Sequence, residues 1–208
     1  MNIIWDFGGT LFDTFPVTIK VFREIFHNYG INLDEDYLKK LLKKSREFAF
    51  ENIKEDFDIK INFNDFMNEY NSIESKYSFD QKPYIDAVNL CKLNLEKKGL
   101  NFIFSHRKKS KIIKLLEKNC MNDLFKDILT VENGLKRKPS SDGILFILEK
   151  YKLSRKDTFS IGDREIDICA SHEAGIRAIL FDPDRKNLKT EADITINDYK
   201  ELVPNLII

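Results

Sequence analysis

From about residue 84 onward, short apolar runs alternate regularly with segments in which apolar residues recur at helical spacing. Such alternation is typical of a parallel sheet whose strands are joined by crossover helices. Together with a run at the N-terminus, the predicted strands are 2–5, 100–104, 128–131, 158–161, 177–181 and 193–196. The predicted helices cover 84–99, 108–119, 141–153 and 165–175. We therefore predict an α/β fold with helices on both faces of a parallel sheet.

The stretch from Thr14 to Gln81 follows a different pattern. It holds three or four helix-period segments, among them KVFREIFHNYG (20–30) and EDYLKKLLKKSREFAFENI (35–53), and no convincing β-branched strand. We interpret its seven phenylalanines as a small helical core rather than a cofactor pocket: Phe22, Phe26, Phe48, Phe50, Phe57, Phe63 and Phe66. The prediction is an all-helical unit, residues 14–81, inserted into a core made of residues 1–13 and 82–208.

Charge and composition exclude several classes of partner. The 34 basic and 34 acidic residues cancel, which gives no electrostatic case for nucleic acid or an anionic membrane. One basic run (Lys39, Lys40, Lys43, Lys44 and Arg46) lies within a predicted helix. Its simplest interpretation is a solvated face; the alternative is a surface that attracts an anionic substrate.

The lack of a recognisable targeting signal and the cysteine usage predict a cytoplasmic location. Asp6 interrupts the first apolar run, and no window approaches the roughly 18 apolar residues of a membrane span. The three cysteines are an odd number without metal-ligand or redox spacing. We expect each of them to be reduced and to serve as a small, buried apolar residue in a predicted helix: Cys91, Cys120 and Cys169. The sequence carries no signal for the oligomeric state.

Polar side chains follow the carboxyl ends of the predicted strands, where open α/β sheets bind their ligands. The first strand ends at Asp6, which precedes the glycine pair Gly8 and Gly9. The other polar residues at strand ends are Ser105, His106 and Arg107 after the second strand, Lys138 after the third, and Asp163 and Asp167 after the fourth. The chain thus directs carboxylates, a hydroxyl and an ammonium group to one edge of the sheet.

Each of these groups has a role if the ligand is a phosphate. A strand-end carboxylate such as Asp6 can attack phosphorus and form an aspartyl-phosphate. Mg²⁺ prefers an oxygen shell with one or two carboxylates, which Asp6, Asp163 and Asp167 can supply. The Ser105 hydroxyl and the Lys138 ammonium can hold the phosphoryl oxygens through the transition state.

With these elements in this order, the sequence resembles the haloacid dehalogenase (HAD) superfamily over nearly its whole length. IIWDFGGTLFDT is similar to the first motif, DxDGT or DxDGV, with Asp6 matching the nucleophile. FSHR places Ser105 at the second motif, and KRKPSSDGILFILEKY places Lys138 at the third. SIGDREIDICASHEAGIRAILF is similar to the fourth motif, with Asp163 and Asp167 at its metal-holding acids.

The resemblance implies a Rossmann-like catalytic core with a helical cap over residues 14–81. Its nearest members would be small phosphatases of the phosphoglycolate-phosphatase and phosphoglucomutase-like branch. It also implies Mg²⁺ as cofactor and a small phosphorylated metabolite as substrate. The implied metal ligands are Asp6, the Gly8 carbonyl, Asp163 and Asp167. The implied catalytic residues are Asp6, Ser105 and Lys138, and the substrate-binding residues are Gly9, Thr10, Ser105, His106, Arg107 and Lys138.

The sequence departs from the first motif at Gly8, where the family has a second aspartate. In the phosphatases that aspartate is the acid for the leaving oxygen and then the base for the hydrolytic water, while its carbonyl binds the metal. Glycine keeps the carbonyl and loses proton transfer, which typically costs about 10²- to 10⁴-fold in rate. Alkyl phosphates suffer most, since their alkoxide leaves badly without a proton.

Three functions remain open at this point. The first is a Mg²⁺-dependent phosphatase with weakened or relocated acid/base chemistry, for which His106 is a candidate, although a rim or substrate-contacting histidine is the simpler interpretation. The second is a non-catalytic or regulatory protein that binds phosphorylated ligands through Ser105, Lys138 and Mg²⁺. The third is a different HAD chemistry such as phosphonate cleavage, which needs a cap lysine poised for a Schiff base.

Overall fold

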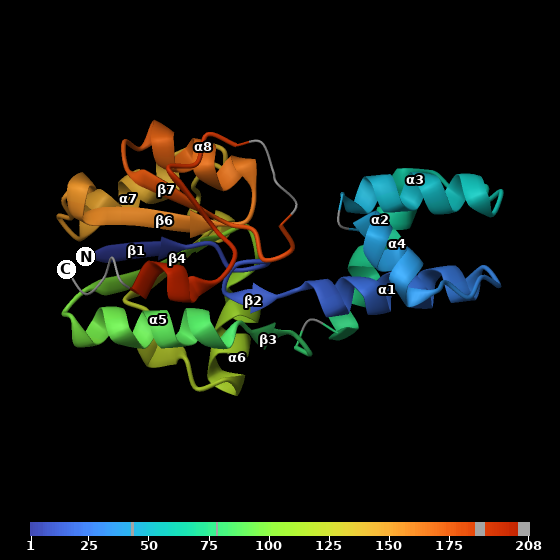
Figure 1. The fold of residues 1–208 in the computed structure, drawn as a ribbon, viewed down its shortest axis with the longest axis horizontal. Helices are drawn as coiled ribbons and strands as arrows, with labels where there is room; N and C mark the ends of the chain where they lie inside the picture. Colours follow the sequence, from blue (N-terminus) through green and yellow to red (C-terminus); the bar gives the residue numbers. More distant parts are fainter. Residues whose placement is uncertain (43, 78, 186–189, 204–208) are drawn as a thin grey trace. The chain divides into compact units, whose positions relative to one another are not determined.

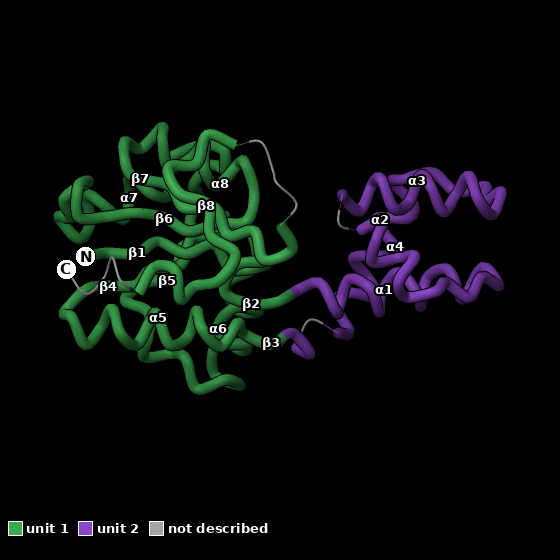
Figure 2. Tube along the Cα trace, in the orientation of Figure 1, with its two compact units in different colours: residues 1–13, 82–208 green, residues 14–81 purple. Residues whose placement is uncertain are grey.

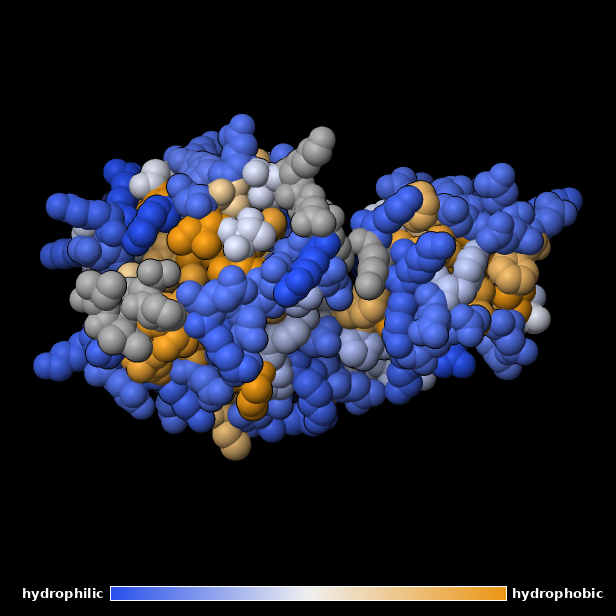
Figure 3. Space-filling view, viewed as in Figure 1, coloured by the Kyte–Doolittle hydropathy of each residue, from blue (hydrophilic) through white to orange (hydrophobic). Residues whose placement is uncertain are grey.

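The computed structural model describes residues 1–42, 44–77, 79–185 and 190–203. The chain divides into two compact units, one made of residues 1–13 and 82–208 and the other of residues 14–81 (Figure 2). On the face drawn in Figure 3, hydrophilic residues cover most of each unit. In the described part of the chain, no helix is long and apolar enough to cross a membrane.

The first unit is built on a six-stranded, all-parallel sheet in the order β5-β4-β1-β6-β7-β8 (Figure 1). Its strands are β1 (Asn2–Trp5), β4 (Leu100–Ser105), β5 (Asp127–Thr130), β6 (Thr158–Gly162), β7 (Arg177–Phe181) and β8 (Ile194–Ile196). Each predicted strand is present within one residue at either end. The predicted α/β fold class is therefore confirmed.

Helices cover both faces of this sheet, as Figure 1 shows. One face carries α5 (Ile85–Glu96) and α6 (Lys109–Lys118), and the other carries α7 (Asp142–Lys150) and α8 (Glu165–Glu173). Short 3₁₀ helices complete the unit: η1 (Asn122–Leu124), η2 (Val131–Asn133), η3 (Arg155–Asp157) and η4 (Tyr199–Leu202). The two-layer covering explains why the strand sequences are almost continuously apolar.

The sequence did not indicate the second sheet of this unit. Two antiparallel strands of two residues each, β2 (Phe12–Asp13) and β3 (Lys82–Pro83), pair where the chain leaves the first unit and where it returns. Two residues are too few to show the period of a strand.

The second unit contains α1 (Phe15–Asn28), α2 (Glu35–Leu42), α3 (Arg46–Asp56) and α4 (Phe63–Tyr77). Four of the seven phenylalanines are fully buried in its core, namely Phe22, Phe26, Phe50 and Phe66. Phe57 departs from the prediction, since 45% of it is exposed. It lies just past the end of α3, where the helical face that packs on the core no longer continues.

The predicted helix over 35–53 is wrong, because the chain breaks there into two helices. Ser45 is the N-cap of α3, and its hydroxyl accepts a hydrogen bond from the Phe48 N–H at 2.9 Å. Of the basic run, Lys39 and Lys40 consequently lie in α2, Lys44 in the turn and Arg46 in α3; Lys43 lies outside the described residues. A serine side chain can cap the start of a new helix by accepting a backbone N–H, and the apolar periodicity alone does not reveal such a break.

The prediction that all three cysteines are buried in helices is also wrong. Cys91 is buried in α5, but Cys120 and Cys169 are exposed. Cys120 lies in the turn after α6 with a positive φ of 54°, and Cys169 lies on the outer side of α8.

A buried amide ties the sheet to one of its helical faces. Asn101, on β4, is fully buried, and its Oδ1 accepts hydrogen bonds from Trp5 Nε1 (3.3 Å) and Asn94 Nδ2 (3.0 Å). Its Nδ2 donates to the carbonyls of Cys91 (3.0 Å) and Leu124 (3.1 Å). One side chain therefore joins β1, β4, α5 and η1.

We predict that Asn101→Ala lowers the free energy of unfolding by about 3 kcal/mol, because it strands two buried donors and two buried carbonyls. Urea unfolding, followed by the fluorescence of the single tryptophan, Trp5, measures this change. The matched control is Asn122→Ala, at an exposed asparagine of η1, which we expect to stay within about 0.5 kcal/mol. Equal losses in both variants would contradict a special role for Asn101.

Candidate active site

The parallel sheet brings distant residues together at the carboxyl ends of its central strands. Asp6 directly follows β1, and its N–H donates to the Ile161 carbonyl of β6 at 2.9 Å, one step beyond the strand. Because β4 and β6 flank β1, Ser105 at the end of β4 and Asp163 just after β6 lie at the same edge. Asp167 lies in the first turn of α8.

A buried lysine connects two of these carboxylates. Lys138, in the segment between η2 and α7, places its Nζ 2.6 Å from Asp6 Oδ1 and 2.7 Å from Asp167 Oδ1. All three side chains are only 4% exposed. Burial by itself lowers the pKa of Lys138, but the two carboxylates outweigh it and hold the pKa above its usual value. Lys138 is therefore an ammonium group that bridges Asp6 and Asp167.

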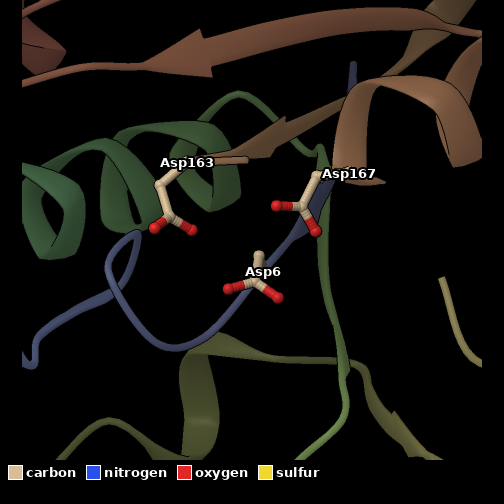
Figure 4. A group of neighbouring side chains, drawn as sticks. All are labelled: Asp6, Asp163 and Asp167. Atoms are coloured by element: carbon tan, nitrogen blue, oxygen red, sulfur yellow. The ribbon is translucent and has the colours of Figure 1, made fainter. Parts of the chain in front are cut away.

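The third carboxylate leaves the site with an excess of negative charge. Oxygens of Asp6, Asp163 and Asp167 lie within 4.8 Å of one another, and Figure 4 shows the three side chains pointing toward a common centre. Burial, and then the charges of Asp6 and Asp167, raise the pKa of Asp163 to about 7. Arg164 offsets this charge only in part, because its Nε lies 3.9 Å from Asp163 and from Asp167 and its side chain is 48% exposed.

This donor set fits a divalent cation with hard oxygen ligands. Three carboxylates crowded around one ammonium repel one another, and a cation such as Mg²⁺ would relieve that repulsion. Mg²⁺ commonly binds through one or two carboxylates and completes its shell with water and substrate oxygens. The oxygens of Asp6, Asp163 and Asp167 are close enough together to share one ion.

The loop after Asp6 is a tight turn closed by backbone hydrogen bonds. The Gly9 N–H donates to the Phe12 carbonyl at 2.8 Å, and the Phe12 N–H donates to the Phe7 carbonyl at 2.9 Å. Gly9 has a φ of +89°, and a Cβ there would lie 2.3 Å from Asp163 Oδ2. Glycine is therefore required at position 9 both for its backbone conformation and for the approach of Asp163.

Thr10 and Tyr199 hold this turn against the rest of the unit. The Thr10 hydroxyl donates to Asp163 Oδ1 at 3.3 Å, and the buried Tyr199 hydroxyl donates to the Thr10 carbonyl at 2.8 Å. Sequence reasoning missed Tyr199, which is 189 residues from Thr10 and belongs to none of the four motifs. A lone tyrosine in a short C-terminal helix carries no signal by which it could have been found.

Gly8 lies in the same turn, where it forms an isolated bridge with Phe12. In the described part of the chain the glycines with positive φ are Gly9, Gly30, Gly134 and Gly175. Gly8 is not among them, so its backbone conformation is open to residues with a side chain. The absence of a carboxylate at position 8 is thus not imposed by the backbone conformation of the turn.

Two predicted substrate-binding residues lie together at the end of β4. Ser105 is buried and its Oγ accepts a hydrogen bond from the Arg107 N–H at 3.3 Å. A hydroxyl that accepts can still donate its own proton to a ligand. The Arg107 guanidinium lies 5.7 Å from the centre of the Phe7 ring, which draws it toward the loop after β1.

His106, the third predicted substrate-binding residue of this strand end, faces Lys138. Its Nε2 accepts a hydrogen bond from the Lys138 backbone N–H at 2.8 Å. Burial, followed by the positive charges of Lys138, Arg164 and Arg137, lowers the pKa of His106 to about 4. The imidazole is therefore neutral near pH 7.

Comparison with known proteins identifies the family. The family model described as haloacid dehalogenase-like hydrolase matches residues 3–181. A candidate pyrophosphatase, PpaX, from Caldanaerobacter subterraneus subsp. tengcongensis is 26% identical over 85% of this chain and 79% of its own length. A hydrolase from Streptococcus pneumoniae TIGR4 is 32% identical, with a TM-score of 0.70 over 87% of this chain and 92% of its own.

A third similar protein is the candidate HAD hydrolase YfnB from Bacillus subtilis, whose structure is described as bound to magnesium. It is 20% identical, covers 100% of this chain and 98% of its own, and has a TM-score of 0.74. At that identity the likeness shows the fold alone. With the family model spanning all four motifs, this chain belongs to the haloacid dehalogenase-like hydrolases.

Proposed function

We propose that this protein is a Mg²⁺-dependent hydrolase of a small phosphorylated metabolite that works through an aspartyl-phosphate on Asp6. The observation that carries the proposal is the bridge from Lys138 to Asp6 and Asp167, with Asp163 beside it. It combines a nucleophile, an ammonium for phosphoryl oxygens and a carboxylate set for a cation. The family and the similarity to a protein named as a pyrophosphatase support a phosphatase. The cytoplasm stays the predicted location.

The proposed reaction divides the work among few side chains. Lys138 holds Asp6 Oδ1, so we assign Oδ2 as the oxygen that attacks phosphorus while the bond to the leaving oxygen breaks. Ser105 and Lys138 are assigned to the phosphoryl oxygens. Mg²⁺, when bound by Asp6, Asp163, Asp167 and the Gly8 carbonyl, supplies positive charge against the carboxylates and the phosphate. Water then releases phosphate from Asp6.

Gly8 favours a restricted substrate range. Residue 8 offers no side chain to protonate the leaving oxygen, so we expect substrates whose leaving group departs as a stable anion, such as anhydrides, acyl phosphates and aryl phosphates. The second candidate function rests on the same residue: a non-catalytic protein that binds phosphorylated ligands and never forms phospho-Asp6. Trapping with a labelled acyl phosphate separates the two, since only the hydrolase labels Asp6 and loses the label in Asp6→Asn.

We predict that Gly8→Asp raises kcat for an alkyl phosphate by about 10²- to 10⁴-fold, because it restores a group for proton transfer. The matched control is Gly8→Asn, which has the same shape and cannot transfer the proton, and we expect no gain from it. A phosphate-ester screen of the three proteins with Mg²⁺ and with EDTA measures the effect. No gain in Gly8→Asp, with Asp6 unreactive in that variant and in the wild type, would overturn the phosphatase proposal.

A second prediction concerns the leaving group. In the wild type, we expect kcat/KM to rise steeply as the pKa of the leaving group falls, because the bond breaks without protonation. In Gly8→Asp the same series is expected to be much flatter. A series of aryl and alkyl phosphates gives the two slopes, and equal wild-type rates for aryl and alkyl esters would contradict the expectation.

A third prediction concerns the metal. We expect Gly9→Ala to weaken Mg²⁺ binding about 10- to 100-fold, because its Cβ would displace Asp163. Gly30→Ala is the matched control: Gly30 has a similar φ of +78°, but a Cβ there meets nothing within 4 Å. Both variants bear comparable backbone strain, and only the first touches the carboxylates. Titration calorimetry with MgCl₂ measures the affinity; equal affinities in the two variants would contradict the assigned ligand set.

A further inference from the structure

His106 and Lys138 are linked through the backbone of the lysine rather than through its charge. The Lys138 N–H donates to His106 Nε2 at 2.8 Å, while the Lys138 Nζ contacts Asp6 and Asp167. The histidine follows β4, and the lysine lies 32 residues later in the segment that leads to α7. The hydrogen bond therefore connects two loops that carry different parts of the site.

This hydrogen bond fixes the chemical form of the imidazole. A ring nitrogen that accepts an N–H bond carries no proton, so the proton of neutral His106 lies on Nδ1. A charged imidazolium has protons on both nitrogens and cannot accept the bond. The neighbourhood favours the neutral form, since the ring is half-buried and faces positive charge from Lys138, Arg164 and Arg137.

The position of the ammonium matters because it is buried between two carboxylates at 2.6 and 2.7 Å. Lysine has four rotatable side-chain bonds, so a fixed backbone is needed to bring its ammonium to one place. The His106 bond supplies a fixed point at the backbone end, and Asp6 and Asp167 supply it at the charged end.

We infer that His106 is a positioning residue, which as a neutral imidazole anchors the backbone of Lys138 and thereby places its ammonium against Asp6. The inference excludes His106 as the relocated acid or base, because neutral Nδ1–H is far too weak an acid to protonate a leaving oxygen and Nε2 is occupied. Its kinetic consequence rests on the proposed function, whereas the hydrogen bond itself does not.

The hydrogen bond is tested on the metal-free protein without substrate. We expect the ¹⁵N shifts of the wild-type ring at pH 7 to show unprotonated Nε2 and protonated Nδ1. We expect His106→Ala to increase the exchange rate of the Lys138 amide by about tenfold or more, because the amide loses its hydrogen bond to the ring. His106→Gln places an acceptor near Nε2 and is expected to keep the exchange slow. The matched control, His172→Gln, changes a histidine whose partner is Asp193 and is expected to leave the Lys138 amide unchanged.

Kinetics with p-nitrophenyl phosphate and glycerol phosphate separate positioning from proton transfer. A positioning residue acts on the phosphoryl group, so His106→Ala should lower kcat for both esters by a similar factor of about 10- to 100-fold, with recovery in His106→Gln. A loss at least tenfold larger for glycerol phosphate, or a ring protonated on both nitrogens at pH 7, would overturn the inference. If wild-type turnover is absent, the proposed function fails, and the amide exchange and ring shifts still decide the role of His106.

Discussion

The site depends on one buried ammonium. Lys138 lies between Asp6 and Asp167 with all three side chains almost fully excluded from water. Removing an ammonium from water costs several kcal/mol, and only close carboxylates with good geometry offset that cost. The bridge also joins three separate segments of the chain, namely the end of β1, the segment before α7 and the first turn of α8. A site with this connection is preorganised, because displacing Lys138 would take the ammonium away from two buried carboxylates at once.

Close backbone approaches make room for this cluster of charges. Gly9 lets Asp163 lie against the turn that follows Asp6, and at Gly162 a Cβ would lie only 2.3 Å from the Cβ of Asp167. The turn is also held by the buried Tyr199 hydroxyl, which donates a hydrogen bond to the Thr10 carbonyl. The two glycines thus leave space for Asp163 and Asp167, and the tyrosine fixes the backbone of the turn whose Thr10 hydroxyl bonds to Asp163.

In the proposed function, the site combines a charged framework with a missing proton donor. The resemblance implies that Gly8 stands where the family's phosphatases carry their proton-transferring aspartate. His106 is hydrogen-bonded to the backbone of Lys138. We expect such a framework to bind and polarise a phosphoryl group but to do little for a poor leaving group. Chemistry of the substrate, rather than of residue 8, would then decide whether the bond to the leaving oxygen breaks.

The sequence by itself determined the parallel α/β fold, its strands to within a residue, and the residue types at the strand ends. These follow from local periodicity and from the rule that ligands bind at the carboxyl ends of parallel strands. Both can be applied to the sequence without knowing which distant segments are in contact. Only the tertiary structure decided that Lys138 bridges Asp6 and Asp167, that His106 holds the lysine backbone, and that Asn101 and Tyr199 fasten the sheet and the turn. It also decided the break at Ser45 and the exposure of Cys120 and Cys169. Each of these is set by a contact between distant segments or by a local side-chain hydrogen bond. Neither kind of interaction produces a periodic pattern of residues in the sequence.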